Sequence, residues 1–391
     1  MANILVSIIS AQTIPNILLI KEWEEVKKIS IDKHFLITTN VMKSKIEWMN
    51  SVCDFGDKKV EVLIKSEDDI TLIQEELDNF NLNRKDNYII NITGGTKILS
   101  LGVYQYFKTF KNTEFYYVNR NFYLKVPDLT GVFEEKKQFQ YKLSVQEYMN
   151  SYGVKLINYQ KIPVQTLQYT NDFLRRRNNQ NFEELSKIDT RNTNFMEWTK
   201  VSQSENVKAK LSKIKFQYSE KGLKIEEIRY LSNAACFEEW CYHTIKNTLN
   251  LSNEQIYLSV EIAKDGVIRH RPDNTNEKND NEIDIVFIYD NTLYVVEVKS
   301  VISKNKQGAD ENKPQFNDIV YKLAAIKDNQ NGFGINVASF LFCYSASLRT
   351  DFDFNNDFGW TYQERANLHN IKLLDKRNID EEIKKLLPKT T

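Results

Sequence analysis

The sequence is poor in the residues that would indicate a disulfide-bonded or zinc-binding protein. Four cysteines (Cys53, Cys236, Cys241 and Cys343) and four histidines occur among 391 residues, and no two cysteines form a CxxC pair. The cysteine spacing fits no zinc site, and scattered thiols are typical of a reducing compartment. We therefore expect free cysteines, no histidine-rich metal site and a cytoplasmic protein.

Long apolar runs and excess charge are also lacking. No stretch approaches the length of a membrane span, and the N-terminus lacks the basic and apolar regions of a cleavable signal. We expect no membrane partner. The 53 Lys and Arg residues balance the 53 Asp and Glu residues, so the formal net charge is zero. Bulk charge therefore does not indicate a nucleic-acid partner, and any basic surface must be local.

The chain does contain enough apolar material for two hydrophobic cores, since 41% of its residues are hydrophobic and 12% are aromatic. In the first third, helical segments separate apolar, β-branched runs that we interpret as strands at residues 3–10, 34–39, 59–64, 88–92 and 114–118. Alternation of this kind predicts βαβ units and a parallel sheet covered on both faces, over residues 1–135.

A second pattern begins at residue 225, after a polar stretch at 136–224 that we interpret as a mostly helical connector. The Arg175–Arg177 run inside this connector is best interpreted as a solvated helix face. Residues 225–391 then predict helices around residues 237–245 and 318–327 and strands at 256–262, 282–288, 293–298 and 337–344. The strands at 282–288 and 293–298 are joined by a turn at Asp290-Asn291, which predicts an antiparallel pair.

These two strands carry a candidate catalytic set. Asp284 lies on the first strand, and Glu297 and Lys299 share one face of the second because side chains alternate along a strand. Hydrolysis of a phosphodiester needs a hard cation, for which two carboxylates supply oxygen ligands to Mg²⁺ or Mn²⁺. A neighbouring lysine can position or deprotonate the attacking water and stabilise negative charge. The spacing therefore predicts a metal-dependent phosphodiesterase site.

Further groups belong to the same candidate site. The carbonyl of Val298 lies between the two charged residues and is a candidate metal ligand, and Glu238 or Glu239 on the preceding helix is a candidate helper. A bare Glu-x-Lys triplet is usually a solvated strand face. Here the flanking residues are apolar, and charges in such a strand are costly unless paired or metal-bound. We therefore favour catalysis for this set.

A candidate phosphate-binding loop lies at the end of the fourth predicted strand. Thr93-Gly94-Gly95-Thr96-Lys97 combines two glycines, which allow close backbone approach, with a positive charge at a helix start. The spacing is not that of a Walker motif, and a plain tight turn is the more common role of such a segment. Its position favours a ligand site, because open α/β sheets bind ligands at the carboxyl ends of their strands. Residues 10–15 and 38–42 end two other strands.

Both halves resemble the CRISPR ancillary nucleases that pair a CARF domain with a PD-(D/E)xK nuclease domain. The nuclease resemblance lies in FEEW, NEIDIVF, LYVVEVKS, the YKL at 321–323 and ERANLHNI near residue 364. The CARF resemblance lies in SxQTIPN, the Thr-Thr at 38–39 and NITGGTKILSLG. One departure is Asn233-Ala234-Ala235-Cys236, where the family usually has a Gly-Gly-aromatic step, and the loop at 269–281 looks long. The connector is unmatched.

The resemblance implies a Rossmann-like N-terminal CARF domain and a restriction-endonuclease-like C-terminal domain with a mixed sheet. It implies a homodimer that binds a cyclic oligoadenylate, with cyclic tetra-adenylate the expected activator. It assigns catalysis to Asp284, Glu297 and Lys299, with Glu238 or Glu239 assisting. Contacts with the activator are implied for Gln12, Thr13, Thr39, Met42, Thr93, Gly94, Gly95, Thr96 and Lys97.

The expected function is therefore an activated, metal-dependent endonuclease of antiviral defence, acting on single-stranded RNA or DNA or nicking duplex DNA. Two alternatives stay open: a nucleotide-sensing DNA-binding regulator that does not cleave, and a ring nuclease that degrades its own activator. An intact Asp/Glu/Lys set argues against the first alternative. Nothing in the N-terminal part offers an obvious general base for the second.

Overall fold

The computed structural model describes most of the chain outside its central and C-terminal loops. The described residues are 1–119, 121–127, 135–163, 165–168, 170, 171, 174, 235–263, 269, 270, 277, 278, 281–299, 316–326, 337–344 and 361–388. The Arg175–Arg177 run, most of the predicted connector and most of the long 269–281 loop lie outside them.

Strands and helices alternate through the first third, as predicted. The strands are β1 (Asn3–Ile8), β2 (Lys33–Thr38), β3 (Lys59–Leu63), β4 (Asn87–Asn91), β5 (Thr113–Asn119), β6 (Phe122–Val126) and β7 (Lys137–Gln138). The helices are α1 (Ile14–Lys21), continued by a π-helical turn (Glu22–Val26), α2 (Ser44–Cys53), α3 (Ile70–Asp78) and α4 (Lys97–Phe107), with a 3₁₀ turn at Gly56–Lys58.

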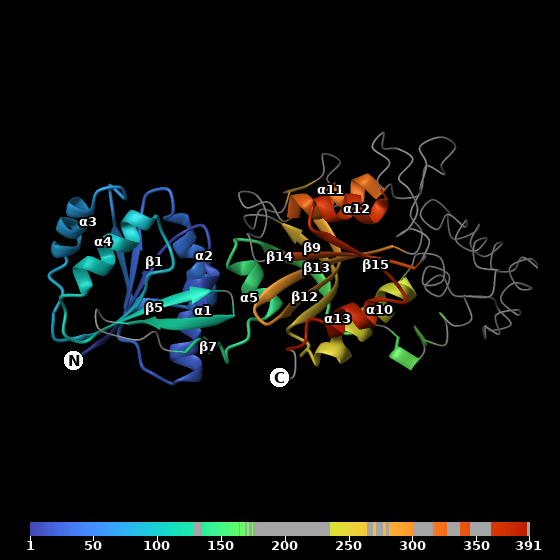
Figure 1. The fold of residues 1–391 in the computed structure, drawn as a ribbon, viewed down its shortest axis with the longest axis horizontal. Coiled ribbons are helices and arrows are strands. Elements are labelled where there is room, and N and C mark those ends of the chain that lie inside the picture. Colours follow the sequence, from blue (N-terminus) through green and yellow to red (C-terminus); the bar gives the residue numbers. More distant parts are fainter. Residues whose placement is uncertain are drawn as a thin grey trace, which may run out of the picture.

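These strands form one sheet in the order β3-β2-β1-β4-β5-β6-β7. Strands β1 to β5 pair in parallel, so the predicted Rossmann-like parallel sheet is confirmed. β6 and β7 extend the sheet with antiparallel pairing, which the alternation of strands and helices did not predict. β6 pairs antiparallel with β5 because the connection between them is too short for the crossover that a parallel pair needs. Both faces are covered: α1 and α2 pack with one buried cluster, and α3 and α4 with another (Figure 1).

The C-terminal domain has a second, mixed sheet. Its strands and helices are α10 (Ala235–Leu249), β9 (Ile256–Ala263), β12 (Asn281–Tyr289), β13 (Thr292–Lys299), α11 (Phe316–Ile326), β14 (Val337–Cys343), α12 (Tyr362–Leu368), β15 (Ile371–Asp375) and α13 (Ile379–Lys384). A short hairpin, β10 (Arg269–His270) and β11 (Glu277–Lys278), lies within the long loop.

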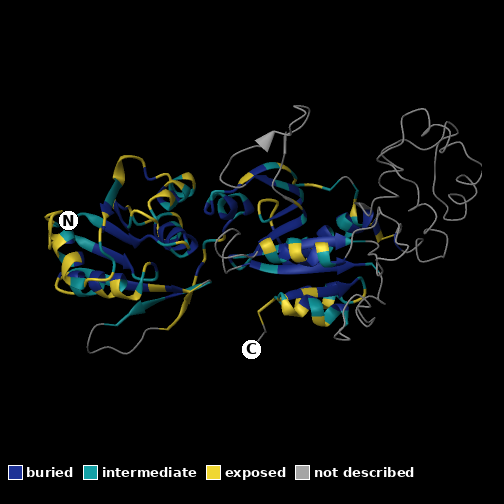
Figure 2. Ribbon diagram, turned by 90° about the horizontal axis from the view of Figure 1, so that it is seen from above, coloured by how far each residue is buried: buried dark blue, intermediate teal, exposed yellow. Residues whose placement is uncertain are grey.

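Six strands pair in the order β15-β14-β13-β12-β9-β8, where β8 is Lys155–Gln160. β13, β14 and β15 are parallel, and the other neighbours are antiparallel, so the predicted mixed sheet is confirmed. Helices α11 and α12 cover one face and α10 and α13 the other (Figure 1). The central strands of both sheets are buried (Figure 2).

The described start of the connector differs from the helical prediction. Residues 135–163 contain the strands β7 and β8 and one short helix, α5 (Val145–Asn150). β8 is an edge strand of the second sheet, where its partner β9 supplies the backbone hydrogen bonds that a polar sequence by itself does not reveal. This segment therefore links one sheet directly to the other.

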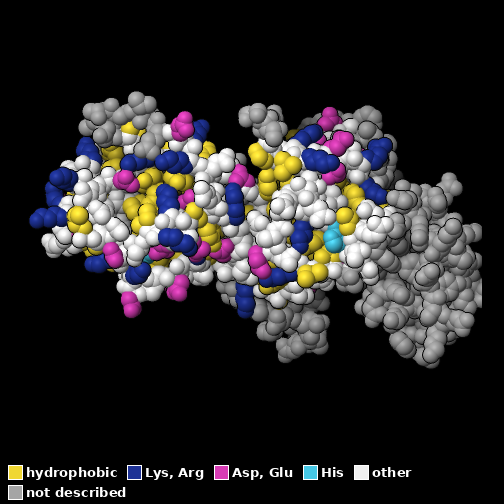
Figure 3. Space-filling model, turned by 90° about the horizontal axis from the view of Figure 1, so that it is seen from below, with side chains coloured by type: hydrophobic (Ala, Val, Ile, Leu, Met, Phe, Trp, Pro, Cys, Tyr) yellow, Lys and Arg dark blue, Asp and Glu magenta, His cyan; other side chains and the backbone are white. Residues whose placement is uncertain are grey.

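The distribution of charged side chains on the surface is consistent with the net charge of zero. On the face shown in Figure 3, Lys and Arg side chains are interspersed with Asp and Glu on both domains. All four cysteines are free thiols, and three of them are buried. Among the described residues, no helix is both long enough and apolar enough to cross a membrane.

Candidate active site and ligand site

The β12–β13 hairpin positions the predicted catalytic residues. Asp290 and Asn291 both have positive φ angles, +49° and +56°, as the two central residues of a tight two-residue hairpin turn require. The pairing begins at Tyr289 and Thr292 and continues to Ile285 opposite Val296. Asp284 comes directly after this paired stretch, and the backbone N–H of Val298 donates to its carboxylate, so Asp284 lies beside the part of β13 that carries Glu297.

The three predicted catalytic side chains meet in the structure. The ammonium nitrogen of Lys299 lies 3.0 Å from Oδ2 of Asp284 and 2.6 Å from Oε1 of Glu297, and therefore bridges the two carboxylates. The backbone N–H of Val298 also donates to Oδ2 of Asp284, at 2.6 Å. Glu297 is 3% exposed, so a second partner is needed for its other oxygen.

That partner is Lys322 on α11, a residue that the sequence analysis did not place in the site. Its Nζ donates to Oε2 of Glu297 at 2.8 Å. The residues alternating with Glu297 along β13, Leu293 and Val295, pack in the same core as α11, so Glu297 faces this helix. In the sequence, two signals pointed to Lys322: the YKL at 321–323 belongs to the family resemblance, and the amphipathic pattern of 316–326 places Lys322 next to buried Leu323.

Electrostatics in the site reflect this pairing. Burial raises the pKa of Asp284, and the charge of Glu297 adds to that shift, while Lys299 and the N–H of Val298 oppose it. Burial acts to lower the pKa of Lys299, but Asp284 and Glu297 outweigh it and hold this pKa above its usual value. Lys299 is therefore a fixed positive charge in this arrangement.

Glu238 and Glu239 take different positions on α10. Burial raises the pKa of Glu238 well above its usual value, and the charge of nearby Asp284 is the next cause. Glu239 is buried and its Oε2 accepts a hydrogen bond from the backbone N–H of Gln165 at 3.1 Å. Glu238 is thus the glutamate on the side of Asp284, while Glu239 fixes the segment at Gln165.

The donor set suits a hard divalent cation. Asp284 and Glu297 offer carboxylate oxygens, and a cation, the Lys299 ammonium, already lies between them. Mg²⁺ is commonly held by one or two carboxylates, with water and substrate oxygens completing its shell. Over the described residues no three His, Cys, Asp or Glu side chains are gathered for a metal.

The predicted ligand loops lie together at the carboxyl edge of the first sheet. Residues 10–13 follow β1, residues 39–42 follow β2 and residues 93–97 follow β4, and these strands are neighbours. Gly94 approaches the end of β1 so closely that a Cβ there would lie 2.1 Å from the carbonyl oxygen of Ile8. Gly95 has φ +76°, which favours glycine. Both glycines are therefore required by the loop.

A buried amide network, which the sequence analysis missed, supports these loops. Nδ2 of Asn91 donates to Oδ1 of Asn16 at 2.7 Å, and Nδ2 of Asn16 donates to the carbonyl of Ile8 at 2.9 Å. The hydroxyl of Thr93 donates to Oδ1 of Asn91 and accepts the N–H of Val118. The Thr93 hydroxyl therefore makes its hydrogen bonds within the protein, to Asn91 and Val118.

The other predicted contact residues differ in exposure. Thr96 caps α4, because its hydroxyl accepts the N–H of Leu99 at 3.1 Å. Lys97 and Gly95 are exposed, whereas Thr39 and Met42 are half-buried. Lys97 is therefore available to an anionic ligand at the start of this helix.

Gln12 and Thr13 connect the ligand loops to residues 141–163, the segment that leads from the first sheet into the second, which we call the linker. Thr13 is fully buried and donates to the carbonyl of Ser151 at 2.6 Å. The hydroxyl of Tyr152 donates to Oε1 of Gln12 at 2.9 Å. The next residue, Gly153, has φ +69°, and a Cβ there would lie 2.5 Å from the ring of Trp48 on α2. The start of the linker is therefore packed tightly against the N-terminal domain.

Comparisons with known families match both domains. A model of the Card1 CARF domain matches residues 4–148, and a model of the Card1-like endonuclease domain matches residues 225–352. No curated protein matches the sequence.

Solved structures share the fold at low identity. Can2 from Sulfobacillus thermosulfidooxidans in complex with cyclic tetra-adenylate is 19% identical, with TM-score 0.67, and the match covers 99% of this chain and 100% of Can2. The protein VC1899 from Vibrio cholerae is 15% identical, with TM-score 0.68, over 98% of this chain and 96% of its own. A type III CRISPR defence DNA nuclease activated by cyclic oligoadenylate is 12% identical, with TM-score 0.52, and the match covers 88% of this chain and 45% of that nuclease.

The ion-pair geometry predicts the stability of the metal-free protein. Lys299→Met leaves Asp284 buried without its cation, and we expect it to lower the free energy of unfolding by about 3 kcal/mol. Denaturant unfolding in EDTA measures this change. Lys384→Met, at an exposed i,i+4 pair on α13, is the matched control and should change stability by less than ~0.5 kcal/mol. Adding Asp284→Asn to Lys299→Met should restore part of the loss, and equal stability of Lys299→Met and the control would contradict the assignment.

Proposed function

Because the chain belongs to the nucleases that join a Card1-type CARF domain to a Card1-like endonuclease domain, we propose that it is a metal-dependent endonuclease switched on by a cyclic oligoadenylate. The observation that carries the proposal is the meeting of Asp284, Glu297 and Lys299 on one hairpin face. The proposed substrate is single-stranded RNA or DNA, with nicking of duplex DNA included.

Each residue has a proposed role. Asp284 and Glu297, with the carbonyl of Val298, would hold Mn²⁺ or Mg²⁺. When bound, such a cation neutralises the phosphate and lowers the pKa of a water. Lys299 has its ammonium within 3.0 Å of both carboxylates, and so stands where it can orient the attacking water and stabilise charge on the phosphate. Glu238, with its raised pKa, is suited to hold a proton beside Asp284.

The activator is proposed to be cyclic tetra-adenylate. The three loops at the carboxyl edge of the first sheet combine backbone N–H groups at Gly94 and Gly95 with the exposed charge of Lys97. Gln12, Thr39 and Met42 lie on the neighbouring loops. The cyclic tetra-adenylate bound to Can2, which has the same fold, supports this choice of ring size.

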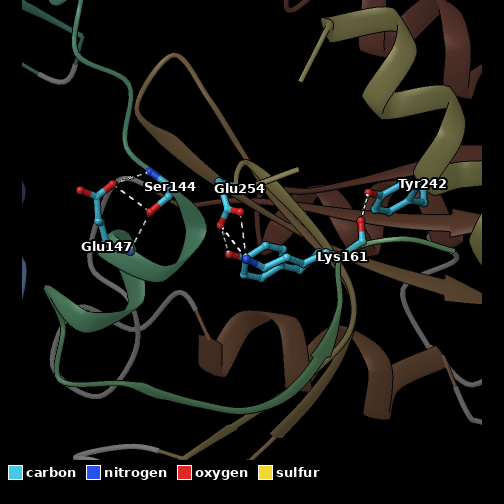
Figure 4. Close-up of polar contacts among 6 residues, drawn as sticks. Ser144, Glu147, Lys161, Tyr242 and Glu254 are labelled. Carbon is cyan, nitrogen blue, oxygen red and sulfur yellow. Dashed lines mark hydrogen bonds and ion pairs between the residues drawn. The ribbon is translucent and has the colours of Figure 1, made fainter. Parts of the chain in front are cut away.

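A physical connection from the ligand loops to the catalytic hairpin supports activation. Gln12 and Thr13 contact Tyr152 and Ser151 at the end of α5. The segment around α5 is fixed to the C-terminal domain, because Lys161 pairs with Glu254 at 2.8 Å and its carbonyl accepts the hydroxyl of Tyr242 (Figure 4). A capping box of Ser144 and Glu147 fixes the start of α5.

The same segment contacts the tip of the catalytic hairpin. The N–H of Leu143 donates to Oδ1 of Asn291 at 2.9 Å, and Nδ2 of Asn291 donates to the carbonyl of Tyr141 at 3.1 Å. Asp290 accepts from Lys142 at 2.9 Å, and also from Asn121 in the β5–β6 turn. These contacts form a continuous path from the ligand loops to the strands that carry Asp284 and Glu297, and the proposed coupling follows this path. An activator acts only through such a difference between two states.

We expect the divalent-ion dependence to appear directly in cleavage assays. Glu297→Ala should lower cleavage of single-stranded RNA and DNA by several orders of magnitude, because it removes one of two carboxylate ligands. EDTA should have the same effect on the wild type, and Mn²⁺ should reverse it. Cleavage would be measured with saturating cyclic tetra-adenylate, with Lys384→Met as control. Full activity in EDTA would contradict metal dependence, and binding without cleavage by the wild type would favour the regulator.

The linker contact predicts a coupling defect. Tyr152→Phe removes the hydrogen bond to Gln12, worth about 1 kcal/mol, and should lower the ratio of activated to basal cleavage about fivefold. Tyr88→Phe is the matched control, because the Tyr88 hydroxyl also donates a hydrogen bond within the N-terminal domain, to the backbone carbonyl of Asn83, at the end of β4 away from the ligand loops. An unchanged activation ratio in Tyr152→Phe would exclude this contact from the coupling.

A homodimer is also part of the proposal, because a cyclic ligand is most simply bound by two identical surfaces around a two-fold axis. Exposed apolar side chains near the ligand loops support it: Leu72 on α3, Ile98 and Leu101 on α4, and Val41. Leu101→Asp should convert the dimer to monomer, measured by light scattering at micromolar concentration. The exposed change Lys384→Met should leave the mass unchanged. A monomeric wild type, with and without activator, would contradict the dimer.

A further inference from the structure

Lys322 is a second lysine at the active site with no role in the cleavage chemistry described above. Its ammonium lies 2.8 Å from Oε2 of Glu297, while Lys299 lies 2.6 Å from Oε1 of the same carboxylate. Lys322 comes from α11, which covers the face of the sheet on which Glu297 lies (Figure 1). Two cations therefore share one buried carboxylate, each at a different oxygen.

The two lysines are not equivalent in geometry. Lys299 bridges both carboxylates, whereas Lys322 contacts Glu297 alone. The Lys322 side chain is 27% exposed, compared with 4% for the Glu297 side chain. Lys322 can therefore leave Glu297 toward solvent by rotating about its own flexible bonds, without a change in the hairpin.

Charge balance indicates when it would leave. Without metal, the charges of Asp284 and Glu297 are matched by those of Lys299 and Lys322. A divalent cation at the carboxylates adds two positive charges within a few ångströms of both ammonium groups, which are then in excess. Each phosphate of a nucleic acid brings one negative charge to the same place. An accessible ammonium released from Glu297 is thus matched by the substrate backbone.

We infer that Lys322 is a substrate-binding residue, which neutralises Glu297 in the metal-free protein and contacts a backbone phosphate of the nucleic acid once a divalent cation occupies the carboxylates. This inference rests on the proposed nuclease function. It assigns Lys322 a direct contact with the substrate, distinct from the role of Lys299 beside the attacking water.

Two measurements on the full-length protein test this role, with Lys322→Met, Lys322→Arg and the control Lys384→Met. The first is Mn²⁺ binding by calorimetry without substrate. Lys322→Met should bind Mn²⁺ several-fold more tightly than the wild type, because a like charge beside the metal site is removed. If Lys322 only held Glu297 in position, the same variant should bind Mn²⁺ more weakly, and that result would overturn the inference.

The second measurement is the salt dependence of binding to single-stranded RNA and DNA oligonucleotides, with Ca²⁺ in place of Mn²⁺ and with cyclic tetra-adenylate. The slope of log K against log salt should fall by about 0.7 in Lys322→Met, since one phosphate contact is lost. Lys322→Arg should keep the wild-type slope, as should Lys384→Met. A wild-type slope in Lys322→Met would overturn the substrate-binding role of Lys322 and leave the proposed nuclease function standing. Failure of the wild type to bind either strand would instead refute the proposed function, and this inference with it.

Discussion

A buried carboxylate, Glu297, and a partly buried one, Asp284, lie on one β-hairpin and require positive charge beside them. The arrangement of the C-terminal domain around the hairpin meets this requirement. Asp284 and Glu297 lie close together on neighbouring strands, because the Lys299 ammonium contacts both of their carboxylates. An unpaired charge at such depth would cost several kcal/mol. Lys299 from the same strand and Lys322 from α11 meet the requirement. The helix that covers this face is therefore held by electrostatics as well as by its apolar side.

The tip of the same hairpin is the point where the two domains meet. Asn291 is buried and exchanges hydrogen bonds with the backbone at Tyr141 and Leu143. One continuous hydrophobic cluster includes Trp23 and Tyr116 of the first domain, Tyr148 of α5 and Val286 of β12. A packed interface of this kind has discrete arrangements and does not deform continuously. Regulation through it is therefore expected to be a switch between two packings.

The ligand edge of the first domain shows a different constraint, the need for close backbone approach. Gly94 lies against the carbonyl of Ile8, and the neighbouring amide network of Asn16 and Asn91 satisfies the polar groups that this approach buries. These contacts hold the loop in place, and a loop that is held in place lowers the entropy cost of binding a ligand. Thr13 and Gln12 lie beside it and extend its contacts to the linker.

Local patterns in the sequence determined the two α/β sheets, most of their strands and the candidate catalytic set of side chains. Apolar runs predict strands, and a two-residue turn between strands fixes a register, so Asp284, Glu297 and Lys299 could be placed together from the sequence. The strand β8 in the connector could not be predicted from the sequence, because its residues are largely polar and it is a strand only through its pairing with β9.

Only the tertiary structure decided which distant groups reach these local features. Lys322 is 25 residues from Glu297, and Thr13 is 138 residues from Ser151, with nothing in the local pattern of either segment to pair them. Such contacts depend on which face of a helix or linker packs against which sheet. The spacing of apolar residues in the sequence predicts which face of a helix or strand is buried. Only the packing of whole elements decides what that face is buried against.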